Sequence, residues 1–297
     1  MGRIGDVVLQ GARTVRRIPI PSAVSLPALR EARRARPQAG VLKRHGVEVE
    51  MIGRTRCVWL DEHRADQGVI VHLHGGAYVS GPFASDWAWL SRQAEAQGCA
   101  ALMVDYRTAP DHQHPIAIED TESVLAALAA AGRLEAPWVL TGQHSGGGVA
   151  LTVARRLIER EDVPSPGGVV VMSPWLDLEL ANAGISETGE SDPVHERRAL
   201  RDAARAYAGR TPLDDPELSP INAGHRGLPP VHLGVGMKDL FLSDVRVLRL
   251  QLEEEGVEVA LREVSGRLGL QLWQRRGEDV DRLHREQSEA IGRALGR

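Results

Sequence analysis

Short apolar runs alternate with longer segments of helical spacing along this chain of 297 residues. The apolar runs predict strands near residues 47–61, 68–74, 100–105, 136–142, 167–173, 230–236 and 257–264. The segments between them predict helices near residues 85–98, 116–132, 146–161, 240–255 and 277–295. Such alternation is typical of a largely parallel sheet that is covered by helices on both faces. The pattern therefore predicts an α/β fold.

The turn between the predicted strand 136–142 and the predicted helix 146–161 has the sequence G-Q-H-S-G. A strand-to-helix turn with the pattern G-x-S-x-G is a nucleophile elbow, which exposes a catalytic serine at its tip. Both glycines are present, as Gly142 and Gly146, but the central residue is His144. The chain therefore has the frame of an acyl-transfer site without the usual attacking serine.

A second glycine turn, with the sequence H-G-G, follows the apolar run at residues 69–73. In this position, backbone N–H groups can stabilise the oxyanion that forms during acyl transfer. We therefore expect an oxyanion hole formed by the N–H groups of Gly75, Gly76 and Ser145.

Other sequence blocks follow in a recognisable order. They read D-Y-R-T-A-P-D-H at 105–112, S-P-W-L-D at 173–177 and G-L-P-P at 227–230. With the glycine turn and the elbow, this series resembles the bacterial hormone-sensitive-lipase-like carboxylesterases over roughly residues 45 to 290. The resemblance implies an α/β-hydrolase fold, with a mostly parallel central sheet, helices on both faces and a helical cap.

The same resemblance suggests how the chain is divided. Residues 1–42 are rich in arginine, with a helix expected from Leu26 to Arg36, and correspond to an N-terminal cap segment. Residues 43–297 correspond to the hydrolase core, with a cap insertion at about 180–226 that contains a predicted helix at 195–208.

The family's catalytic triad can be carried over position by position. His144 takes the place of the nucleophilic serine, Asp239 that of the acid, and Gly269 that of the catalytic histidine. Two of the three triad residues are therefore replaced. Ser145 would become the nucleophile only if the elbow shifted by one residue, which would put Gln143 where the turn needs glycine.

The replacements are concentrated at the active site, whereas the other family blocks are intact. A glycine at position 269 also leaves space for the imidazole of His144. We interpret the chain as an engineered or designed esterase in which His144 is the nucleophile beside a retained oxyanion hole. The alternatives are a designed catalyst of conjugate addition to an enone through the same histidine, and a catalytically dead scaffold that binds its ligand, as in a natural inactive relative.

Five residues near the two turns in sequence are expected to line the substrate pocket: His74, Tyr78, Trp87, Trp89 and Gln143. For the two tryptophans, a packing role is the alternative. The expected substrate is a small ester or another acyl or enone compound.

Composition narrows the other possibilities. The formal net charge of −4 predicts no nucleic-acid partner. The sequence contains no long apolar span or signal-peptide pattern, so we expect a cytoplasmic protein with no membrane partner. We also expect no metal and no cofactor, and two buried thiols at Cys57 and Cys99 rather than a disulfide. The oligomeric state is left open, a homodimer included.

Overall fold

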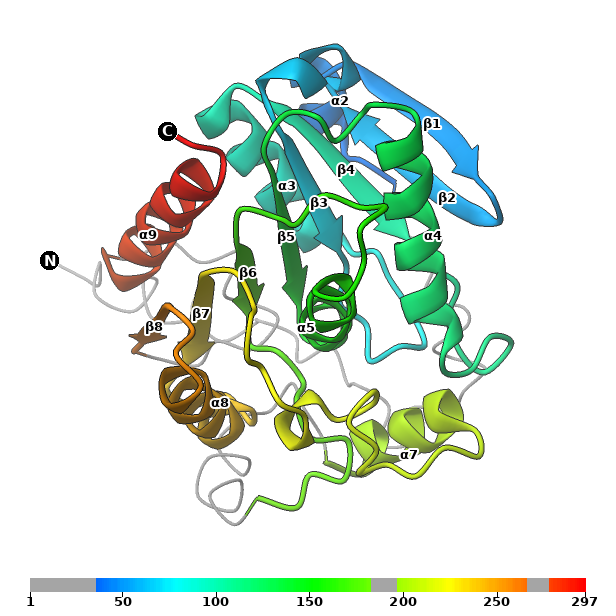
Figure 1. The fold of residues 1–297 in the computed structure, drawn as a ribbon, viewed down its shortest axis with the longest axis vertical. Coiled ribbons are helices and arrows are strands. Elements are labelled where there is room, and N and C mark those ends of the chain that lie inside the picture. The colour runs from blue at the N-terminus through cyan, green and yellow to red at the C-terminus, as the bar shows by residue number, and fades with distance from the viewer. Residues whose placement is uncertain (1–35, 183–196, 266–277) are drawn as a thin grey trace, which may run out of the picture.

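The computed structural model describes residues 36–182, 197–265 and 278–297. Strands in these ranges form one sheet of eight in the order β1-β2-β4-β3-β5-β6-β7-β8 (Figure 1). From β4 to β8, neighbouring strands run parallel, whereas β1 and β2 are antiparallel to their neighbours. The strands are β1 Val47–Ile52, β2 Thr55–Leu60, β3 Val69–Leu73, β4 Ala100–Asp105, β5 Trp138–Gln143, β6 Val169–Met172, β7 Val231–Gly236 and β8 Val259–Val264. The prediction of a mostly parallel sheet is confirmed.

The single strand predicted at 47–61 is wrong, because the structure has a hairpin there. Ile52 pairs with Thr55 across a two-residue turn, in which Gly53 has a φ of 60°. A two-residue hairpin turn needs a positive φ at its first central residue, and glycine adopts it without steric cost. The alternating pattern continued through this turn, so only one glycine marked the break.

Two layers of helices cover the sheet, as predicted (Figure 1). On one face lie α3 (Ala84–Gln97) and α9 (Glu278–Ala294), which also contact each other. On the other face lie α4 (Ile116–Ala130), α5 (Ser145–Leu157) and α8 (Leu242–Glu254). Each of these helices begins and ends within three residues of its predicted bounds, with one exception. The structure ends α5 at Leu157, whereas the sequence predicts its end at 161.

The sheet carries a hydrophobic core on each of its two faces. In β3, Val71 and Leu73 belong to the core beneath α4, α5 and α8, whereas Ile70 belongs to the core beneath α3 and α9. Successive side chains of a strand point to opposite faces, so a strand covered on both sides reads as one continuous apolar run. This explains why the central strands were easy to locate in the sequence.

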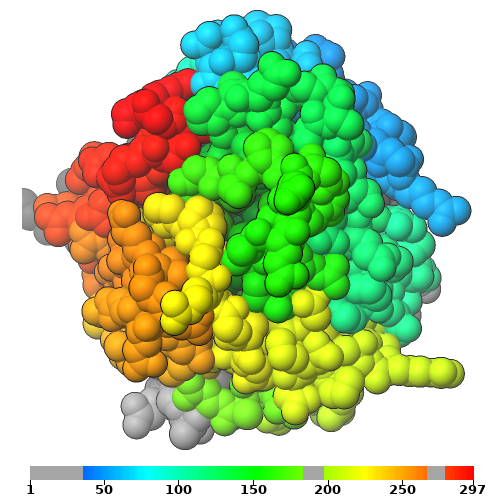
Figure 2. Space-filling model, viewed as in Figure 1, coloured from blue at the N-terminus to red at the C-terminus, as the bar shows by residue number. Residues whose placement is uncertain are grey.

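From residue 197 on, the segment expected to be a cap insertion lies beyond the carboxyl ends of the parallel strands, where Figure 1 shows α7 (Arg197–Ala208). In the space-filling view, the yellow-green region that contains α7 packs directly against the core (Figure 2). The helix expected from Leu26 to Arg36 lies outside the described residues except for Arg36 itself. Gly269 also lies outside them. The division into a cap segment, a core and a cap insertion stays a prediction.

No helix within the described ranges is long and apolar enough to cross a membrane. The two thiols behave as expected: Cys57 and Cys99 are free and buried. Burial, the main cause, raises the pKa of Cys57 to about 12 and that of Cys99 to about 11, so both are unreactive thiols at neutral pH.

Candidate active site

His144 occupies the tip of the turn between β5 and α5, as the elbow pattern predicts. Its φ and ψ of 49° and −117° lie outside helix and strand, in a region that costs an ordinary residue about 1–3 kcal/mol. The surrounding backbone holds this conformation: the N–H of His144 donates to Met172 O at 2.9 Å, and its carbonyl accepts from Trp175 N at 2.9 Å. Ser145 is the first residue of α5 and is fully buried, so it does not occupy the tip.

Close backbone packing explains the two glycines of the elbow. A Cβ on Gly146 would lie 2.2 Å from the Leu73 carbonyl oxygen, and a Cβ on Gly142 would lie 2.3 Å from the Gly146 carbonyl oxygen. Neither position can hold a larger residue without moving the backbone. The elbow therefore keeps the packing of a nucleophile turn although its serine is absent.

The H-G-G turn after β3 lies directly against the elbow. A Cβ on Gly75 would lie 3.4 Å from Cδ2 of His144, so the backbone of this turn is next to the imidazole. Gly76 has a φ of 125°, and a Cβ there would lie 2.1 Å from the Ser80 carbonyl oxygen. The two turns that the sequence singled out therefore meet in space.

One of the three expected oxyanion donors is already engaged. Gly75 N–H donates to Oδ1 of Asp86 at 3.4 Å, and the same oxygen accepts a hydrogen bond from Nε2 of Gln143. The expected hole therefore rests on the N–H groups of Gly76 and Ser145. The second is at the start of α5, where N–H groups have no partner within the helix.

Asp86 is a fully buried carboxylate that the sequence analysis did not single out. Its Oδ2 accepts the N–H of Phe83 at 2.6 Å, and its Oδ1 lies 3.4 Å from Nε2 of His72. Nδ1 of His72 lies 2.8 Å from Thr141 Oγ1 on β5. Asp86 thus connects α3, the H-G-G turn and Gln143, the residue before His144 in the elbow. A histidine within the apolar run of β3 was the available sign of this buried network.

His74 supports the glycine turn from within the core. Its Nδ1–H donates to the Gly75 carbonyl at 2.7 Å, and its ring stacks on Tyr106 with centroids 4.2 Å apart. The Tyr106 hydroxyl donates to the His74 carbonyl at 2.7 Å. Burial lowers the pKa of His74, despite the opposing field of Asp105, so the ring is neutral at neutral pH. These contacts make His74 a support for the turn rather than a pocket wall.

Tyr78 links the glycine turn to the inserted segment. Its ring stacks on Tyr207 of α7, with centroids 4.0 Å apart and planes 2° apart, and lies 5.7 Å from the Trp175 ring. Both tyrosines are buried, and burial raises the pKa of each phenol. The helix over the strand ends is thereby fixed to the loop that carries the expected oxyanion donors.

The structure gives Trp87 and Trp89 a packing role rather than a place in the substrate pocket. Both belong to the core between the sheet and α3 and α9. The Trp89 indole N–H donates to Gln287 Oε1 of α9 at 3.2 Å, and its ring lies 4.9 Å from that of His72. Their nearness to the H-G-G turn in sequence was misleading, because α3 turns their side chains to the face away from α5.

Asp239 follows β7 and is fully buried. Its Oδ1 accepts the N–H of Phe241 at 3.1 Å. The Phe241 ring lies 6.1 Å from the His144 ring and 6.0 Å from the Trp175 ring, as measured between centroids. Phe241 and Trp175 are therefore aromatic neighbours of the elbow that the sequence analysis had not assigned to it.

A hydrogen-bonded Ser–His–Asp series also exists elsewhere in the chain. His45 Nδ1 lies 2.6 Å from Asp61 Oδ2, and its Nε2 lies 2.8 Å from Ser91 Oγ. Ser91 is fully buried within α3, and its hydroxyl also accepts a hydrogen bond from Arg44 at 3.3 Å. No substrate can reach this serine, so the series joins α2 (Ala39–Arg44) to α3 and does not form an active site. Within the described ranges, no group of three or more His, Cys, Asp or Glu side chains is arranged to hold a metal.

Comparison with known proteins agrees with this geometry. Residues 70–268 match the family described as "alpha/beta hydrolase fold". An esterase of Acinetobacter venetianus is 30% identical over 199 residues, which are 67% of this chain and 65% of that protein, slightly under two thirds of its length. An acetyl-hydrolase of Streptomyces hygroscopicus is 28% identical over 216 residues, or 73% of this chain and 72% of that protein.

Among solved structures, an esterase of the bacterial hormone-sensitive lipase family superposes with a TM-score of 0.74 at 26% identity, covering 91% of this chain and 94% of that one. The chain therefore belongs to the α/β-hydrolase fold family.

Proposed function

We propose that this protein acts on small activated esters through the imidazole of His144. The neutral ring attacks the acyl carbon with a nitrogen lone pair, and the carbonyl oxygen takes up the displaced electron pair as an oxyanion. When the carbonyl re-forms, the alkoxide or phenoxide leaves with the bonding electrons and takes up a proton, and the acylated ring loses the proton of its other nitrogen to give the neutral acyl-imidazole. Water then cleaves the acyl-imidazole and releases the carboxylic acid.

The conformation of His144 is the observation that carries this proposal. A strained residue at the tip of a turn persists only where the surrounding structure holds it, and such residues are concentrated at functional sites. The tip faces the H-G-G turn. The N–H of Gly76 in that turn and the N–H of Ser145 at the start of α5 can stabilise an oxyanion beside the ring. The names of the relatives, an esterase and an acetyl-hydrolase, favour short acyl esters such as acetates as the substrate class.

A second candidate is the binding of an acyl ligand without turnover. The hydrogen bond between Gly75 N–H and Asp86 favours it, because one expected oxyanion donor is occupied. Removal of an oxyanion donor typically lowers kcat by about 10²–10³-fold. An acyl compound could then occupy the pocket without reacting.

Mass spectrometry after brief exposure to p-nitrophenyl acetate separates the two candidates. Samples are quenched at short times and mapped by proteolysis. The proposal expects one acetyl group on the peptide that contains His144, absent from a His144→Ala variant and retained in the surface variant His63→Ala. Release of nitrophenol without an adduct at His144, or an acetyl group on Ser145, would contradict it. Saturable binding without any adduct would support the second candidate.

A further inference from the structure

The C-terminal end of α7 is held by the loop between β4 and α4. A helix leaves its last four carbonyls without partners inside the helix. Two of those in α7 accept from N–H groups of the residues that follow it. The carbonyl of Ala206 accepts from Nε2 of Gln113 at 3.2 Å. The carbonyl of Tyr207 accepts from the N–H of His114 at 2.8 Å. The loop therefore completes the cap of this helix from outside it.

The ring of His114 packs against the same end of α7. It meets the Tyr207 ring edge-on, with centroids 5.9 Å apart. Its Nδ1 lies 3.2 Å from Oγ1 of Thr211, three residues beyond the helix. His114 therefore contacts α7 through its backbone and the end of the helix through both its ring and Nδ1.

The neutral form of His114 suits this contact. A neutral imidazole can donate from Nδ1 to the Thr211 hydroxyl and keep Nε2 as an unprotonated acceptor. Nε2 is buried and has no hydrogen-bond partner among the described residues. Protonation would place a second N–H and a positive charge at this nitrogen, where the described residues offer no acceptor. A buried charged donor without an acceptor is costly, so protonation opposes the contact.

The charges that face His114 act in both directions. Asp215, Glu217 and Glu119 of α4 favour the protonated ring. The guanidinium of Arg156 on α5, which pairs with Glu217 at 2.5 Å, disfavours it. Burial is the largest effect and lowers the pKa of His114 below its usual value of 6.5. The stability that this contributes is fully present above pH 6.5 and is lost as the pH falls through the folded pKa.

We propose that His114 is an acid-sensitive latch for the C-terminal end of α7. Near neutral pH the ring is uncharged and the loop holds the helix. In acid the ring takes up a proton, its contacts with Tyr207 and Thr211 are lost, and the end of α7 separates from the loop. Because Tyr207 also stacks on Tyr78, this release loosens the loop that follows the H-G-G turn. The latch does not depend on the chemistry of His144.

Hydrogen–deuterium exchange of the full chain, read by mass spectrometry, tests this latch. Protection of α7 peptides is compared at about pH 7 and about pH 5, after correction for the intrinsic pH dependence of amide exchange. In the parent it should fall about threefold or more in acid, because local opening becomes easier. In His114→Gln, whose side chain does not titrate, it should change little. Sheet peptides of this variant with parental protection at pH 7 would show that it is folded.

Two further variants of the same loop serve as matched tests. His112→Gln removes a histidine whose side chain makes no hydrogen bond or ring contact with α7 within the described ranges, and it should respond to acid like the parent. Gln113→Ala removes the partner of the Ala206 carbonyl. It should lower the protection of α7 equally at both pH values and leave the acid response in place, because glutamine does not titrate.

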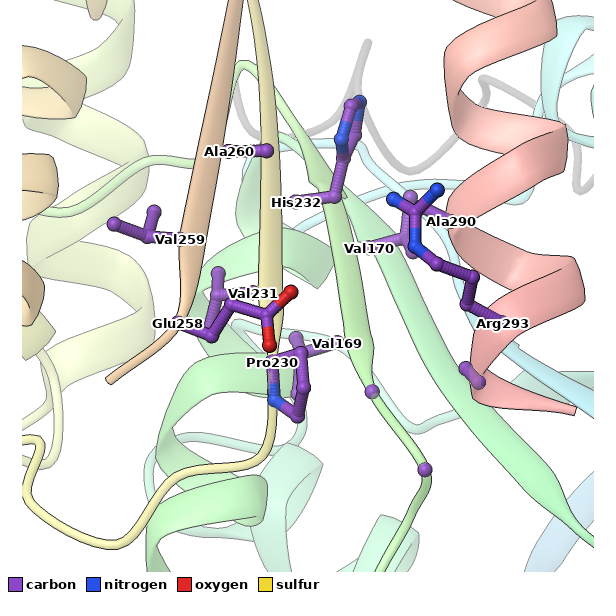
Figure 3. A pocket seen from close by; sticks show the side chains of 13 residues that line it. Val169, Val170, Pro230, Val231, His232, Glu258, Val259, Ala260, Ala290 and Arg293 are labelled. Atoms are coloured by element: carbon purple, nitrogen blue, oxygen red, sulfur yellow. The ribbon is translucent and has the colours of Figure 1, made fainter. Parts of the chain in front are cut away.

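Another buried histidine provides the control for a general loss of stability. His232 is the second residue of β7, and Figure 3 shows it with Arg293 of α9, whereas α7 lies beyond the opposite ends of the strands. Burial, the largest effect, lowers the pKa of His232 to about 4. Peptides from β7 and α9 therefore report loosening of the fold that is unrelated to His114.

Three results would overturn the proposal. Equal falls in the parent and in His114→Gln would show that another group senses the acid. Higher protection of α7 in acid would mean that Asp215 and Glu217 outweigh burial, so that the charged ring strengthens the contact. Equal falls in α7, β7 and α9 of the parent would mean that the whole fold loosens rather than the end of this helix.

Discussion

The rings of Tyr78 and Tyr207 are stacked in parallel, with centroids 4.0 Å apart. Tyr78 belongs to the loop after β3 that carries the expected oxyanion donors, and Tyr207 belongs to α7 in the inserted segment. This one contact joins the inserted helix to the backbone beside His144. The position of α7 and the geometry of the expected oxyanion hole should therefore be energetically coupled.

Truncation of this stack should destabilise the protein. Tyr207→Ala removes a fully buried aromatic ring and should lower the free energy of unfolding by about 3–5 kcal/mol. Tyr207→Phe retains the ring and should change it little, because the hydroxyl has no hydrogen-bond partner among the described residues. Urea denaturation followed by circular dichroism measures both. Equal losses for the two variants would mean that the hydroxyl, and not the stack, is the stabilising group.

Alanine at position 146 should disturb the elbow. The added Cβ would lie 2.2 Å from the Leu73 carbonyl oxygen, so the backbone must move, at a cost of about 1–3 kcal/mol for overpacking. The control is Gly40→Ala in the exposed helix α2, where a Cβ meets no atom within 4 Å. That change should be neutral or slightly stabilising. A Gly146→Ala protein as stable as the parent would show that the two turns are less tightly packed than described.

His232 should make stability depend on pH in the acidic range. Its folded pKa of about 4 is below the usual unfolded value of about 6.5, so between these two values the unfolded chain binds more protons. The contribution of His232 to the free energy of unfolding is therefore fully present above pH 6.5, and it is lost as the pH falls toward 4. A shift of this size corresponds to about 3 kcal/mol.

The comparison of His232→Leu with the parent isolates this effect from that of other groups. Asp244 acts in the opposite direction, because burial raises its pKa to about 7, and it is present in both proteins. The parent should lose more stability than His232→Leu between pH 7 and pH 4. His63→Leu, at an exposed histidine, should follow the parent. Parallel curves for the parent and His232→Leu would refute a depressed pKa at this site.

Restoration of the serine alone should not restore an efficient esterase. In His144→Ser, the new hydroxyl has no base to remove its proton, since position 269 is glycine. The double variant His144→Ser with Gly269→His should regain part of the activity toward p-nitrophenyl acetate, with Asp239 as the acid. If the single variant were as active as the double one, position 269 would not be that of the lost base.

Much of the fold could be predicted because local pattern and tertiary structure agree. The parallel strands are buried on both faces and read as apolar runs, and the elbow glycines are required by backbone contacts as close as that of Gly146 with Leu73. The hairpin at Gly53 was missed because the alternating pattern continued across it.

The site was harder to predict because its contacts connect distant parts of the chain. Asp86 reaches the glycine turn and Gln143 from α3, and Phe241 reaches His144 from the loop after β7. Trp87 and Trp89 are close to the glycine turn in sequence, yet the helix directs them into the opposite core. Sequence proximity was therefore a poor guide to which side chains lie beside the elbow.

The pH dependence of nitrophenol release from p-nitrophenyl acetate tests the role of His144 most directly. A protonated imidazole has no lone pair available for attack, so the parent's rate above background should fall about tenfold for each pH unit below the pKa of the ring. His144→Ala should lack this pH-dependent rate, and the surface variant His63→Ala should keep it. Equal rates in the parent and His144→Ala, or a parent rate that rises as the solution becomes acidic, would contradict nucleophilic catalysis by His144.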